Sequence, residues 1–175
     1  MRQAIGPQHP LRRFFAGLVE QVFMSDLGLC SPTLLDYLTE LLSGFVHIDD
    51  IYRLRAVDGA VIRELSRMHA EACLGQELSA TARTRVINRY IGDFTLFWTG
   101  VYPESLRARH ATVDRLQEYL IQGKHSYNIA GELSDDTNQP PGSLLRQLSR
   151  QFEYCVHGLS LVRGQWEQAR RQSRN

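Results

Sequence analysis

The sequence predicts an all-α protein, a single-domain helical bundle of about seven helices. Residues 81–99 carry a broad apolar stripe at helical spacing, and apolar side chains of residues 143–170 recur in alternating steps of three and four. No segment sustains the two-residue alternation of a strand. The length of 175 residues suits one well-packed domain, which we place at residues 11–170.

The first two helices are predicted from apolar spacing and from their end signals. Residues 1–10 form an irregular arm, because a glycine and two prolines interrupt them. A helix follows from Leu11 and ends before Gly28. Ser31 and the proline after it provide an N-cap and a first-turn proline for a helix whose buried stripe extends to Phe45.

Residues 46–54 alternate briefly like a strand, but no partner strand is visible in the sequence. We therefore predict a bend and a short helix there. A turn at 58–59 precedes a further helix over 61–72, and Ser79 is the predicted N-cap of the helix that follows.

The helix over 81–99 is expected at the centre of the bundle, because its apolar face is broad. Its stripe consists of Val86, Tyr90, Phe94 and Trp98 at every fourth position, widened by Ile87, Ile91 and Phe97. Small residues such as Gly92 and Thr95 allow another helix to approach closely. Gly100 is predicted to end this helix, and Pro103 to begin the next.

The segment after Pro103 is predicted to form a short helical piece to about residue 109 and then a helix over 113–120 that Gly123 ends. Residues 124–133 are predicted as one more short helix. Residues 134–142 are polar, contain two prolines and form the clearest predicted loop.

The last helix, residues 143–170, is predicted to be long and unbroken. Its apolar row, here called the C-terminal seam, consists of Leu145, Leu148, Phe152, Cys155, Leu159, Val162 and Trp166. This near-heptad spacing favours packing along another helix, and the length of the helix leaves part of the seam for a second copy of the chain. Residues 171–175 are predicted to be a frayed tail.

Composition limits the partners and the compartment. The 20 basic and 19 acidic residues leave a formal net charge of +1, which disfavours nucleic acid as a partner. No apolar run approaches the roughly 20 residues of a membrane-spanning helix, and no signal peptide is recognisable. The three cysteines are odd in number and far apart, so we expect a reducing, cytoplasmic location.

Five segments, 31–38, 45–55, 91–104, 123–127 and 152–155, together resemble an uncharacterised group of bacterial helical proteins. The resemblance spans most of the chain. It implies a single bacterial helical domain, and it carries no activity, cofactor, partner or site residue across.

Arg85, Arg89 and Asp93 lie four residues apart on one line of the predicted central helix. An Arg89–Asp93 pair held against an aromatic core would orient an anionic ligand. The competing interpretation is an ordinary helix ion pair, which stabilises an exposed helix by a few tenths of a kcal/mol.

Glu153 and His157 share one helical face, and a carboxylate can set the tautomer of a histidine and make it a base. No nucleophile is recognisable beside them, and polar residues ordinarily flank an apolar seam. Cys155 is predicted to be a core residue and not a reactive thiol.

Tyr102 and Glu104 flank a proline at one end of the bundle, where loops often carry function; turn chemistry explains the same residues without a ligand. Lys124 is the only lysine and a weaker candidate. Ser126 is predicted to cap the helix after it, with Tyr127 packed inward.

His47, Asp49 and Asp50 offer metal-ligand chemistry within a short span, and His69 with Glu64 or Glu71 would complete a set. Divalent-metal bundles repeat Glu-x-x-His pairs on facing helices, and this chain has none. Helix capping by Asp49 or Asp50 is therefore the favoured interpretation, and no metal and no cofactor are predicted.

The favoured function is a cytoplasmic protein-interaction or regulatory module without catalytic activity, which binds a protein partner or a second copy of itself. The alternative is a small-molecule or metal-binding protein, or an enzyme, with a polar pocket between helices near Arg89, Asp93 and His157. These classes differ in whether the polar groups converge on a cavity.

Overall fold

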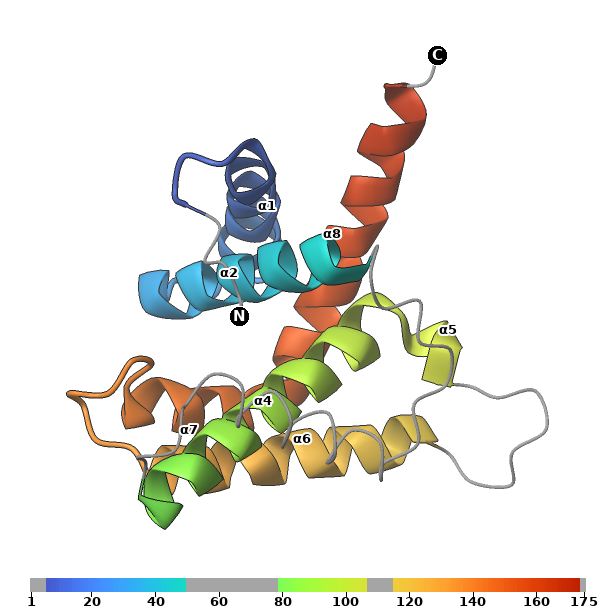
Figure 1. Ribbon diagram of the computed structural model, residues 1–175. Helices are drawn as coiled ribbons and strands as arrows, with labels where there is room; N and C mark the ends of the chain where they lie inside the picture. The colour runs from blue at the N-terminus through green and yellow to red at the C-terminus, as the bar shows by residue number, and fades with distance from the viewer. Residues whose placement is uncertain (1–5, 50–78, 107–114, 174–175) are drawn as a thin grey trace.

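Helices account for nearly all of the chain that the computed structural model describes, residues 6–49, 79–106 and 115–173, and no strand occurs in these ranges (Figure 1). The all-α prediction is confirmed for this part of the chain. The count of about seven helices stays a prediction, because the predicted helix over 61–72 lies outside the described residues.

Helix α1 (Pro10–Glu20) begins one residue earlier than predicted, at a proline. The His9 side chain caps it by accepting a hydrogen bond from the Leu11 N–H at 3.2 Å. The chain continues as a π-helical turn, η1 (Gln21–Asp26). Gly28 follows with φ +69°, in the left-handed region that favours glycine, so the predicted break there is confirmed.

Helix α2 (Pro32–Asp49) begins at the predicted proline. It continues through Asp49, so the bend predicted within 46–54 does not occur at 46–49, and the rest of that segment lies outside the described residues. Four residues of alternation are too few to override a helix whose buried face already extends to Phe45, and that ring stacks on Phe97 with centroids 4.7 Å apart.

Helix α4 (Ala80–Val101) begins where Ser79 was predicted to cap it, and the Ser79 hydroxyl accepts from the Ala82 N–H at 3.1 Å. Gly100 does not end the helix. A Cβ at this position would lie 2.7 Å from the Leu159 Cβ, so the glycine lets another helix approach. Pro103 begins the short helix α5 (Pro103–Leu106), as predicted.

Helix α6 (Arg115–Glu132) is continuous, so the two helices predicted on either side of Gly123 are wrong. A Cβ on Gly123 would lie 2.3 Å from the Phe152 ring and 2.5 Å from the Thr95 hydroxyl oxygen. This glycine therefore serves close helix packing and not helix termination. Ser126, predicted as a cap, is buried inside the same helix.

The helix predicted over 143–170 is instead two helices, α7 (Gly142–Arg150) and α8 (Phe152–Gln172). At Gln151 the backbone turns to φ −104° and ψ 22°, and its N–H donates to the Gln147 carbonyl at 2.9 Å. The two helices differ in direction because α7 packs mainly on α6, whereas α8 packs on α4 and α1 (Figure 1).

Two further boundaries can be compared with the predictions. Helix α8 extends into the predicted frayed tail, through Arg171 and Gln172. The predicted polar loop before α7 is confirmed as the connection from α6.

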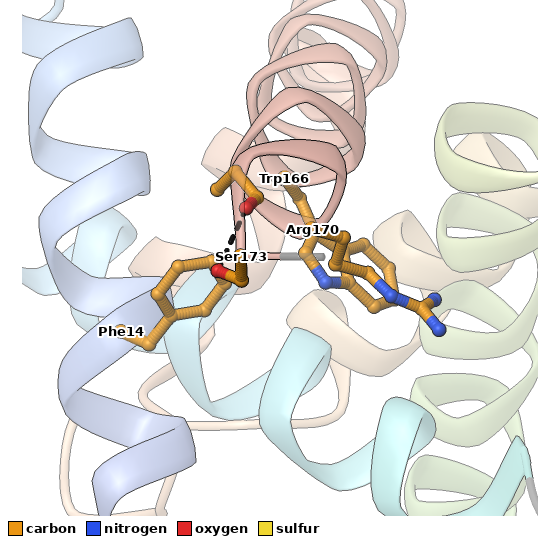
Figure 2. Close-up of a pocket in the computed structure, with 5 residues that line it drawn as sticks. Phe14, Trp166, Arg170 and Ser173 are labelled. Carbon is orange, nitrogen blue, oxygen red and sulfur yellow. Dashed lines mark hydrogen bonds between the residues drawn. The ribbon is translucent and has the colours of Figure 1, made fainter. Parts of the chain in front are cut away.

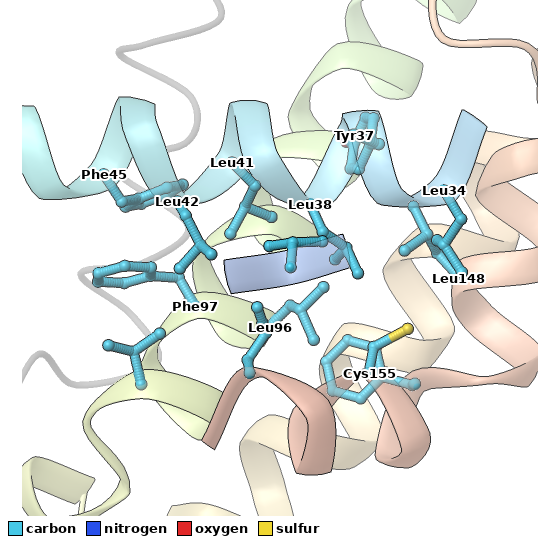
Figure 3. Close-up of a cluster of buried hydrophobic side chains, with 14 of the residues drawn as sticks. Leu34, Tyr37, Leu38, Leu41, Leu42, Phe45, Leu96, Phe97, Leu148 and Cys155 are labelled. Carbon is cyan, nitrogen blue, oxygen red and sulfur yellow. The ribbon is translucent and has the colours of Figure 1, made fainter. Parts of the chain in front are cut away.

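Helices α4 and α6 lie side by side, and α7 runs along α6 (Figure 1). Helix α1 packs on α2 and on α8. The core is a single apolar cluster: side chains of α2 such as Leu38 and Leu42 face Leu96 and Phe97 of α4 and Cys155 of α8 (Figure 3).

Candidate functional site

A buried carboxylate lies where α2, α4 and α6 meet. Asp93 of α4 is 2 % exposed, and one of its oxygens accepts hydrogen bonds from the Tyr37 hydroxyl at 2.5 Å and the Tyr127 hydroxyl at 2.8 Å. Its other oxygen lies 3.8 Å from Nε of Arg89. The structure thus brings the predicted Arg89–Asp93 pair together and adds a tyrosine from each of two neighbouring helices.

The electrostatics of this cluster follow from its burial. A buried carboxylate is stable only when charges and donors replace water, and two hydroxyls and a guanidinium do so here. Burial and the nearby Asp93 charge raise the pKa of both Tyr37 and Tyr127, so both phenols remain hydrogen-bond donors far above neutral pH. The chemical result is a fixed charge pair with protonated tyrosines.

Arg89 connects this cluster to the surface. Burial alone would lower the pKa of Arg89, but the neighbouring Tyr37 and Asp93 have the larger, opposite effect. The pKa is therefore raised above its usual value, and the guanidinium stays charged. Its side chain is 33 % exposed, its Nη1 donates to the Gln139 carbonyl at 3.4 Å, and its Cζ lies 5.5 Å from the Tyr37 ring centre. Arg89 therefore links α2 and α4 to the loop before α7.

Tyr102 and Glu104 meet an arginine that the sequence-based predictions do not include. Nη1 of Arg163 lies 2.7 Å from Glu104 and donates to the Val101 carbonyl at the end of α4. The guanidinium lies 4.9 Å from the Tyr102 ring centre, and its Nε pairs with Glu167 at 2.8 Å. These contacts hold the end of α4 against α8.

Glu153 and His157 are both exposed on α8. Glu153 pairs with Lys124 of α6 at 2.8 Å, and this hydrogen bond lowers the pKa of the Glu153 carboxyl. The structure thus pairs Glu153 with the lysine. In the described part of the chain, no hydrogen bond joins Glu153 to His157 or His157 to the Asp93 cluster.

Cys155 is a core residue, as predicted. Burial raises the pKa of its thiol to about 12, so the thiol is protonated and a poor nucleophile at neutral pH.

The structure describes the backbone of His47 and Asp49 within α2 but not their side chains, and the other residues of this predicted set, from Asp50 to Glu71, lie outside the described ranges. Within the described ranges, no group of three His, Cys, Asp or Glu side chains is close enough to hold a metal ion. In the same ranges no helix is both long and apolar enough to cross a membrane.

A shallow hollow of about 520 Å³ lies between α1 and the last turns of α8. Phe14 of α1 lines one side, and Trp166, Ala169 and Arg170 of α8 line the other, together with Ser173 directly after that helix (Figure 2). The sequence-based predictions include Trp166 only as the last residue of the C-terminal seam. We call these five residues the α1–α8 hollow.

The predictions also omit Tyr37 as a partner of Asp93. The one sequence signal is that a tyrosine interrupts a row of leucines, since a buried phenol needs an acceptor.

Searches of protein-family models, of curated proteins and of solved structures found no match to this chain. The resemblance to a bacterial helical group therefore stays a prediction.

Proposed function

We propose that the protein is a cytoplasmic interaction or regulatory module that works through contacts with another protein, without catalytic activity. The observation that carries this proposal is the α1–α8 hollow, which places Phe14, Trp166 and Arg170 together at the surface. Aromatic residues and arginine dominate the energetics of protein interfaces. We also propose α4 as the central helix of the bundle, because it packs on both α6 and α8.

The other polar candidates favour the same proposal, because Arg89, Asp93, Glu104 and Glu153 each have a charged partner within the fold. Asp93 holds Arg89 and two tyrosines, and Arg163 holds Glu104. These contacts account for the polar side chains by their role in holding the helices together, without a bound ligand. Cys30 and Cys155 are free thiols, which agrees with the proposed cytoplasmic location.

Self-association could not use the C-terminal seam in the way that the sequence predicts. Every seam residue from Leu145 to Val162 is buried inside the chain, so these side chains offer no surface to a second copy. A second copy would have to use Trp166 and the turns after it.

Native mass spectrometry of the freshly purified chain tests this proposal against its alternative. We expect the mass of one or two bare chains. Extra mass that matches a metal ion or a small molecule would favour the alternative function instead.

A capture experiment tests the interaction surface itself. A Phe14→Ala chain should lose partners that the wild-type chain captures from lysate of the source cells.

The second candidate is a protein that binds a small anion, and Arg89 favours it. Its guanidinium is fixed by Asp93 and Tyr37 and is one-third exposed, an arrangement that suits a carboxylate or phosphate. If this is the function, the retained mass should disappear in Arg89→Ala and persist in an Arg83→Ala control on the same helix.

A further inference from the structure

The α1–α8 hollow has apolar walls. Phe14 is 38 % exposed although its ring packs edge-on against Phe15, with centroids 5.4 Å apart. Trp166 is half-buried and packs edge-on against the same Phe15 at 5.3 Å. Both aromatic walls are therefore anchored in the core through one buried ring, which fixes the shape of the hollow before any ligand arrives.

The hollow carries a positive charge at Arg170. Arg170 lines it, with its guanidinium 5.9 Å from the Trp166 ring centre. Arg13 precedes Phe14, Arg171 follows Arg170, and all three arginines are exposed. In the described part of the chain none of them forms an ion pair, whereas the nearby Arg163 is held by Glu104 and Glu167.

We propose that the α1–α8 hollow binds an acidic amphipathic segment of a partner protein. An apolar side chain of that segment packs between Phe14 and Trp166 above Ala169, and a neighbouring carboxylate pairs with Arg170. This inference rests on the proposed interaction function and adds the partner's chemistry to it.

Charge complementarity selects this occupant. The whole chain has a net charge of only +1, so an exposed arginine that lines an apolar hollow, without an ion pair in the described part of the chain, gives a local preference for an acidic partner. The hollow is shallow and lies between two helices, a shape that suits an amphipathic helix docked along a groove. A carboxylate at Arg170 would set the register, while the aromatic contacts supply most of the affinity.

The test uses the full chain and a phage-displayed library of random peptides about 16 residues long, enough for about four helical turns. Peptides enriched on the wild-type chain are synthesised, and their affinities are measured for four variants. Phe14→Ala and Arg170→Glu alter the hollow. Ile121→Ala and Arg83→Glu are matched controls, an exposed apolar side chain and an exposed arginine on other helices.

We expect enriched peptides to carry Asp or Glu beside apolar residues spaced three or four apart. Their affinity should fall about tenfold or more in Phe14→Ala and Arg170→Glu and stay unchanged in both controls. Replacing the acidic residues of a peptide with lysine should abolish binding. Urea unfolding confirms that each variant is folded, which Arg170→Glu should be because Arg170 is exposed.

Other results would overturn the inference, and they distinguish it from the proposed function. Enriched peptides that bind the hollow variants as tightly as the wild type would place the interaction elsewhere and leave the module function standing. No enrichment, together with a retained small molecule in native mass spectrometry, would overturn both. Binding to phosphatidylglycerol vesicles, or a dimer, that Arg170→Glu abolishes would make a lipid surface or a second copy the occupant.

Discussion

The Asp93 carboxylate accepts hydrogen bonds from tyrosines of two other helices, so its removal leaves two buried hydroxyls without their acceptor and the Arg89 guanidinium without its nearby negative charge. We predict that Asp93→Ala lowers the free energy of unfolding by about 3 kcal/mol. Urea unfolding followed by circular dichroism measures this change. Tyr37→Phe removes one donor only and should cost less.

Glu153→Ala is the matched control for Asp93→Ala. It removes a carboxylate from an ion pair in which both side chains are substantially exposed, Glu153 by 57 % and Lys124 by 42 %. Exposed pairs contribute about 0.2–1 kcal/mol, so its effect should be several-fold smaller. Equal losses in the two variants would show that the Asp93 cluster is not a buried polar junction.

Cys155 combines full burial with a pKa of about 12, so its thiol should not react in the folded protein. We predict that a chain with Cys30→Ser and Cys73→Ser, which keeps Cys155 alone, resists a thiol reagent at pH 8 until urea unfolds it. A chain that keeps only the exposed Cys30 should react at once. Rapid labelling of Cys155 without denaturant would contradict its place in the core.

At the residue scale, the sequence predicts the Arg89–Asp93 pair because four-residue spacing on a helix is a local property. It cannot supply Tyr37 or Tyr127, which are 56 and 34 residues away from Asp93 along the chain. Their contacts depend on how three helices pack, and spacing within one helix carries no information on that packing.

At the element scale, α8 contains two glycines in opposite situations. A Cβ on Gly158 would lie 2.1 Å from the Phe23 ring, whereas a Cβ on Gly164 would meet no atom within 4 Å. We predict that Gly158→Ala destabilises the protein by about 1–3 kcal/mol through overpacking. Gly164→Ala should stabilise it by about 0.5–1 kcal/mol, because alanine loses less backbone entropy in a helix.

Thermal unfolding of the two variants side by side measures both signs. Because the substitution and the helix are the same, the intrinsic gain in helix propensity is common to both, and the difference reports the packing of η1 on α8. A rise in melting temperature for both variants would mean that Phe23 does not press against Gly158.

Helix ends were predictable where they depend on neighbouring residues. The cap at Ser79 and the start at Pro103 are local hydrogen-bond and backbone effects. The structural role of Gly123 depends on its contact with Phe152 of another helix. The sequence alone therefore does not distinguish a glycine that permits close packing from one that ends a helix. The break at Gln151 is likewise hidden, because the step from Leu148 to Phe152 keeps the helical spacing.

At the scale of the whole molecule, the buried groups predict how stability depends on pH. Burial raises the folded-state pKa of Tyr37, Tyr127 and Cys155 above the values of about 10 and 8.5 expected in an unfolded chain. The folded state therefore holds these protons more tightly than the unfolded state. Their contribution is fully present at neutral pH and is lost as the pH rises past the unfolded values.

We predict that the free energy of unfolding declines from about pH 9 and falls more steeply above about pH 10, by about 1.4 kcal/mol per pH unit for each group. Urea unfolding at pH 7–11 measures the slope. Replacing both tyrosines with phenylalanine should lower stability at pH 7, since two hydrogen bonds to Asp93 are lost, and should also flatten the decline above pH 10. If stability falls equally steeply with pH in this variant and in the wild type, other groups cause the loss of stability at alkaline pH. The reason is that Tyr37 and Tyr127 link this junction of three helices to pH only if they keep their protons in the folded state.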